Sequence, residues 1–112
     1  MSWPSDADGD VFRELAARNF NFTEEACIDF SVDFEKWPPA PQAISRLEEM
    51  YGQVEVVPPS KKRKGEPALD GYVQFQIRSR LEYDLVVSVQ QRASEEMEPF
   101  GGCCESWGLA AN

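Results

Sequence analysis

The sequence predicts an α+β fold, a four-stranded antiparallel sheet with two helices on one face and an additional N-terminal helix. Apolar and polar residues alternate strictly over residues 28–35, which is typical of a half-buried strand. Two later stretches, 41–51 and 81–97, show the apolar spacing of amphipathic helices. A chain of 112 residues fits one domain, 1–112, with one hydrophobic core.

The N-terminal helix is expected over about ten residues and ends near Asn19. Three carboxylates, Asp6, Asp8 and Asp10, can cap its first turn, where acidic groups also complement the helix dipole. Apolar residues then recur at helical spacing: Val11, Phe12, Leu15 and Ala16.

The strand at 28–35 is followed by a helix and a second strand. Trp37-Pro-Pro-Ala-Pro41 ends the strand, and Pro41 suits the first position of a helix. The helix carries one apolar stripe, formed by Ile44, Leu47, Met50 and Tyr51. Gly52 is a plausible C-terminal stop. The second strand is expected at about 53–57, with Val54 and either Val56 or Val57 pointing inward.

The second half repeats this order after a flexible basic loop at 58–71. A third strand is expected over 72–79, a helix over 81–97 and a short final strand over 103–107. The order strand-helix-strand-strand-helix-strand is that of the ferredoxin-like fold.

Charge and composition narrow the classes of function. The chain has 11 basic and 20 acidic residues, a net charge of −9, and no histidine. The acidic excess disfavours direct nucleic-acid binding and favours a basic protein partner. The missing histidine removes the commonest general base and histidine metal sites. The run Lys61-Lys-Arg-Lys64 is expected to keep its loop hydrated, with contact to RNA as the alternative.

The strand at 28–35 also supplies the candidate site. Its polar side carries Asp29, Asp33 and Glu35, which would lie beside residues such as Arg78 of the third strand. These carboxylates form either a docking surface for a basic partner, a solvated face, or a strand-to-strand ion pair of Asp33 or Glu35 with Arg78. Trp107 is a further candidate, because an exposed tryptophan anchors interfaces, although it can equally cap the core.

Catalysis or metal binding by the same carboxylates is a weaker alternative. They lie on one strand with no visible companions elsewhere, so no catalytic residue, metal site or cofactor is predicted. Cys103 and Cys104 are expected to point one inward and one outward, without an activated thiol. No apolar stretch is long enough to span a membrane and no signal peptide is apparent, so a cytoplasmic location is expected.

Several of these features together resemble one protein family. They are the helix after acidic residues, the strand Ile28-Asp-Phe-Ser-Val-Asp-Phe34, the helix end Tyr51-Gly-Gln-Val-Glu-Val56 and the closing Gly101-Gly-Cys-Cys-Glu-Ser-Trp-Gly108. Over residues 6–108 the chain resembles the RraB family, regulators of ribonuclease E activity. That family closes on Asp-Gly-Trp-Gly, and here Glu105-Ser106 replaces Asp-Gly.

The resemblance implies a ferredoxin-like fold and a small acidic cytoplasmic bacterial protein. Such a protein binds the endoribonuclease, or its scaffold region, and reduces its cleavage of RNA without chemistry of its own. This chain lacks the long acidic tail of members with that activity and carries the basic run at 61–64. An immunity-type protein or other module for a different basic partner is therefore the alternative. Pairing of two copies through the open sheet face is a further one.

Overall fold

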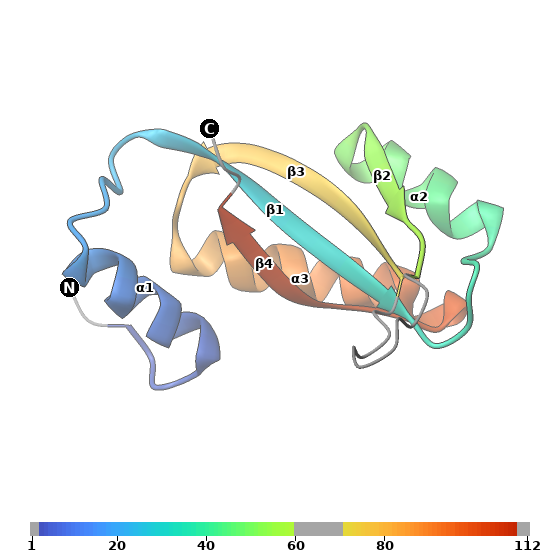
Figure 1. Ribbon diagram of the computed structural model, residues 1–112, viewed down its shortest axis with the longest axis horizontal. Helices are drawn as coiled ribbons and strands as arrows, with labels where there is room; N and C mark the ends of the chain where they lie inside the picture. Colours follow the sequence, from blue (N-terminus) through green and yellow to red (C-terminus); the bar gives the residue numbers. More distant parts are fainter. Residues whose placement is uncertain (1–2, 60–70, 110–112) are drawn as a thin grey trace, which may run out of the picture.

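The computed structural model of the chain describes residues 3–59 and 71–109, and it confirms the α+β arrangement (Figure 1). The predicted basic run Lys61–Lys64 lies outside these residues. The elements, in chain order, are α1 (Ala7–Ala17), β1 (Glu25–Phe34), α2 (Pro41–Tyr51), β2 (Val54–Val57), β3 (Tyr72–Arg80), α3 (Tyr83–Met97), the 3-10 helix η1 (Glu98–Phe100) and β4 (Gly102–Leu109).

The four strands form one antiparallel sheet in the order β2-β3-β1-β4, which is the ferredoxin-like order. β1 is therefore a central strand, hydrogen-bonded to β3 on one side and to β4 on the other. Helices α2 and α3 both lie behind the sheet in the view of Figure 1, while α1 lies to one side, near the end of β4. None of the described helices covers the front of the sheet.

Three strands extend further than their apolar pattern predicts. β1 begins at Glu25 rather than at residue 28, because Glu25 pairs with Arg80 and Ala26 with Ser79. β4 likewise reaches from Gly102 to Leu109, and β3 continues to Arg80. Backbone pairing needs no apolar alternation, so strands continue beyond the residues that face the core.

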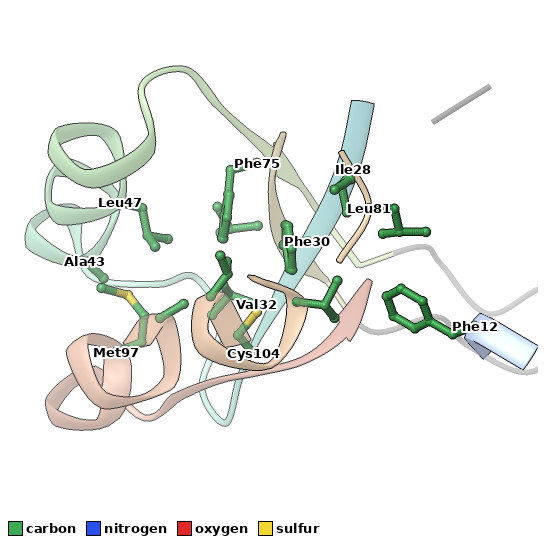
Figure 2. Close-up of a cluster of buried hydrophobic side chains, with 14 residues drawn as sticks. Phe12, Ile28, Phe30, Val32, Ala43, Leu47, Phe75, Leu81, Met97 and Cys104 are labelled. Carbon is green, nitrogen blue, oxygen red and sulfur yellow. The ribbon is translucent and has the colours of Figure 1, made fainter. Parts of the chain in front are cut away.

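The core lies between the sheet and the helices and extends to α1 (Figure 2). Phe30 of β1 stacks on Phe75 of β3, with ring centroids 5.4 Å apart, and Tyr51 at the end of α2 stacks on the same Phe75 at 4.0 Å. The buried apolar residues are Phe12, Ile28, Phe30, Val32, Ala43, Leu47, Val73, Phe75, Leu81, Val86, Val89, Ala93, Met97 and Cys104.

The ends of α2 follow the sequence signals. Pro41 occupies the first turn, and Gly52 adopts φ 86°, a left-handed value that glycine accepts readily. The Arg46 guanidinium donates to both carboxylate oxygens of Glu96 in α3, at 3.0 and 3.1 Å, so the two helices are also joined at their surface.

The edge strand β2 confirms that Val54 and Val56 point inward. Val54 is half-buried as expected, and Val56 lies on the core face opposite Val73, but Val56 remains 45% exposed. Val57 instead points to the other face, opposite Tyr72. A position at the edge of a sheet has a neighbouring strand on one side only, so an inward direction does not guarantee burial.

We predict that Phe30→Ala lowers the free energy of unfolding by about 3–5 kcal/mol, because it leaves a cavity where Phe30 and Phe75 stack. Val11→Ala, at a position 39% exposed on α1, is the control and should change it by less than about 0.5 kcal/mol. Urea unfolding measures both, and equal losses for the two variants would contradict this description of the core.

Candidate functional site

The outer face, the side of the sheet turned away from α2 and α3, is predominantly polar. Strand register places Asp29 opposite Gln76, Ser31 opposite Gln74 and Asp33 opposite Tyr72. The outer face comprises Glu25, Cys27, Asp29, Ser31, Asp33, Glu55, Val57, Tyr72, Gln74, Gln76, Arg78, Arg80, Cys103, Glu105, Ser106 and Gly108. An antiparallel sheet with one apolar and one wet side has this composition.

Two of the predicted carboxylates lie on the outer face itself. Asp29 is half-buried near the middle of β1, and Asp33 is exposed about 13 Å further along the strand. Glu35 follows the end of β1, where its backbone N–H donates to the Gly101 carbonyl at 3.0 Å and its exposed side chain lies against Gly101. Asp29 and Asp33 thus lie on one strand, and Glu35 comes directly after its end.

Two further acidic residues join them from the neighbouring strands. Glu55 of β2 opposes Gln74, and Glu105 of β4 hydrogen-bonds with the Cys103 side chain at the bulge where the β1–β4 register shifts. Neither residue is among the carboxylates that the sequence pattern predicts for this surface. Strand order and the bulge place them on this face, whereas local alternation does not reveal them.

The other end of the outer face is basic. Arg78 and Arg80 are exposed near the end of β3, and Arg78 donates to Glu25 at 3.3 Å. The sequence analysis allowed an ion pair of Arg78 with Asp33 or Glu35, and the structure places Arg78 with Glu25 instead. Both partners are well exposed, so this pair contributes little to stability.

Trp107 lies on the opposite side of the sheet from Asp29. It pairs with Phe30, on the core face, and its ring centroid lies 5.6 Å from that of Phe12 in α1. The indole Nε1 donates to Asp8 Oδ1 at 2.8 Å. Trp107 therefore fastens α1 to the sheet, and one flat partner surface cannot contact both it and Asp29.

The acidic start of α1 completes this attachment. Asp6 caps the helix by accepting from the Gly9 N–H at 2.7 Å, and it also accepts from the Tyr83 hydroxyl. These two donors, Tyr83 foremost, lower the pKa of Asp6 below 3.8, and the same bond raises the pKa of Tyr83 to about 12. Asp8 also accepts from Gln90 of α3 at 3.3 Å.

The adjacent cysteines point to opposite faces, as predicted. Cys104 is buried in the core, and burial raises the pKa of its thiol to about 12. Cys103 lies opposite Asp33 and is half-buried at the edge of the sheet, where its sulfur is 3.8 Å from Ser94 Oγ of α3; its pKa is raised first by burial and then by Glu105. Both thiols are therefore protonated near neutral pH and poor nucleophiles.

Within residues 3–59 and 71–109, no three cysteine or acidic side chains come together in a group that could hold a metal ion. In the same part of the chain, no helix has the length and apolar character needed to cross a membrane.

Comparison with models of protein families places the chain in a known family. A family model described as "Regulator of ribonuclease activity B" (RraB) matches residues 5–109, nearly the whole chain. No curated protein and no solved structure matches the chain.

The attachment of α1 makes stability depend on pH. Since the folded-state pKa of Asp6 lies below 3.8, its contribution is present above that value and is lost as pH falls through the folded-state pKa. Asp6→Asn keeps the cap and should lose less stability than the wild type between about pH 5 and about pH 2.5. Urea unfolding across this range measures the difference.

The control for this prediction is Glu48→Gln, a change at an exposed carboxylate of α2 outside the attachment. It should keep the wild-type pH profile. A profile for Asp6→Asn that coincides with that of the wild type would contradict the role given to Asp6.

Proposed function

The chain belongs to the RraB family of regulators of ribonuclease activity, and on that premise we propose that it is a non-catalytic cytoplasmic protein of bacteria. It binds ribonuclease E, or its scaffold region, and reduces RNA cleavage by protein–protein contact. The observation that carries the proposal is the outer face, a sheet surface that the described helices leave open and that presents acidic side chains.

The charge of this surface fits a partner that handles RNA. Protein segments that bind RNA are rich in Lys and Arg, because neutralising phosphates supplies much of their affinity. An acidic protein attracts the same segments and competes for them. Asp33, Glu35 and Glu105 are all exposed at the same end of the outer face, at a distance from Arg78 and Arg80.

The acidic residues of α1 are less suitable for this role. Asp6 and Asp8 accept hydrogen bonds from Tyr83, Trp107 and Gln90, so binding a partner there would compete with the attachment of the helix. The carboxylates of the outer face therefore support the proposal better than those of α1, although both groups contribute to the net charge of −9.

A non-catalytic role agrees with the chemistry of the outer face. The chain has no histidine, and its outer-face carboxylates are spread along a flat strand. General acid–base work needs two groups that converge on one reacting atom. A surface of this kind is better suited to holding a basic protein than to cleaving a bond.

We predict that the double variant Asp33→Lys, Glu35→Lys binds ribonuclease E roughly tenfold or more weakly than the wild type, because like charges then face the basic partner. Biolayer interferometry measures the affinity, and cleavage of an RNA substrate by the ribonuclease measures the loss of inhibition. Wild-type binding should also weaken as salt is raised.

The matched control is Glu48→Lys, a charge reversal at an exposed site on α2, behind the sheet. It should retain binding, and circular dichroism confirms that each variant is folded. Equal weakening by the control and the double variant would indicate a general charge effect and refute the outer face as the binding surface. Wild-type protein that does not bind ribonuclease E would direct the search to a different basic partner.

A further inference from the structure

Asp29 has an unusual position on the outer face. It lies near the middle of the central strand, between Gln76 on β3 and Gly108 on β4. Its Oδ1 atom is buried and has no hydrogen-bond partner among the described residues. The carboxylate has therefore lost contact with water at one oxygen without gaining a donor from the protein.

An acceptor in this state gains more from a new donor than an exposed carboxylate does. A hydrated oxygen exchanges one hydrogen bond for another when a partner binds, so its net gain is small. The negative charge is shared by both carboxylate oxygens, so burial of Oδ1 without a donor leaves the whole carboxylate poorly solvated, and a cation that reaches its other oxygen from the surface gains more than it would at a fully hydrated carboxylate.

The neighbour on β4 leaves room for such a group. A Cβ atom placed on Gly108 would meet no atom of residues 3–59 and 71–109 within 4 Å, so the described part of the chain leaves space beside Asp29. The next pair of these strands on the outer face consists of two small polar residues, Ser31 and Ser106. A flat side chain can lie over this part of the sheet and reach the Asp29 carboxylate from the side of Gly108.

We propose that Asp29 is the anchor for an arginine side chain of the partner, which lies over Gly108 with its guanidinium against the carboxylate. This inference rests on the proposed function and names the chemistry of that contact. A guanidinium is planar and carries five N–H donors in a fixed fork, so it can bond the accessible oxygen of Asp29 and a second acceptor together, whereas the ammonium of lysine is a compact point charge. The side-chain carbonyl of the exposed Gln76 can accept a further guanidinium N–H.

The surroundings of Asp29 can accommodate the residues that flank this arginine. Gln76 itself lines an open hollow of about 770 Å³ beside β2, together with polar residues such as Glu55 and Gln74 and apolar ones such as Val54. Arg78 and its ion-pair partner Glu25 largely compensate each other at one end of the outer face, so a basic segment is attracted more strongly to the end that carries Asp33. A basic segment laid across the strands would therefore pass over Asp29.

The test is a titration of the ¹⁵N-labelled full chain with a six-residue arginine peptide and, separately, with a six-residue lysine peptide, followed by NMR. We expect the arginine peptide to bind more tightly and to shift the backbone amide of Gly108 and the side-chain amide of Gln76. Asp29→Asn should weaken binding of the arginine peptide by roughly tenfold or more and remove its preference over lysine.

A second variant, Gly108→Val, tests the same site without changing Asp29, in case the Asp29→Asn variant does not fold. Valine suits a strand, and its Cβ atom has free space here, so the fold should persist while the approach to Asp29 is blocked. We expect it to abolish the preference for arginine and to leave the affinity for the lysine peptide unchanged. NMR spectra of the protein alone, recorded at decreasing protein concentration, show whether a second copy of the chain binds this surface.

The outcomes separate this inference from the proposed function. Equal affinity for the two peptides, or unchanged binding of arginine by both variants, would overturn the arginine site. If ribonuclease E binding is then still lost in the variant Asp33→Lys, Glu35→Lys, the proposed function stands without it. Shifts at Gly108 that depend on protein concentration alone would mean that a second copy occupies the surface, and would also overturn the inference.

Discussion

The pairing of β1 on both of its sides is the constraint on which the rest of the structure depends. Because this strand lies between β3 and β4, its alternation of apolar and polar residues determines the character of both sheet faces. Ile28, Phe30 and Val32 are completely buried beneath the helices, so Asp29 and Asp33 must point the other way. A shift of one residue in register would bury two carboxylates, and the hydrophobic core therefore also fixes the position of the acidic outer face.

The acidic residues serve two separate purposes. Asp6 and Asp8 accept hydrogen bonds from α3 and β4. These carboxylates therefore stabilise the attachment of α1 to the rest of the protein. The carboxylates of the outer face lie on a surface that the described helices leave open. The net charge of −9 counts both groups of carboxylates together. The hydrogen bonds made by Asp6 and Asp8 separate the α1 group, which binds within the protein, from the group on the outer face.

Local patterns predicted the elements and the sheet topology well, because alternation, helical spacing and capping residues all act within a few residues. Local sequence patterns could not predict the role of Trp107. Its bond with Asp8 joins residues 99 positions apart, and only the folded chain shows that its indole faces the core. Glu55 and Glu105 were not predicted to lie on the outer face for a related reason. Which sheet face an edge-strand residue occupies depends on the register with the neighbouring strand and on bulges.

The central claim is that the outer face, and not the helical side, contacts the ribonuclease. Carbodiimide labelling of carboxylates, followed by mass spectrometry with and without bound ribonuclease E, tests this most directly. If the outer face is the binding surface, bound ribonuclease E should reduce the labelling of Asp29, Asp33 and Glu105 and leave the labelling of Glu48 on α2 unchanged. Protection of Glu48 with unchanged labelling of the outer face would contradict it.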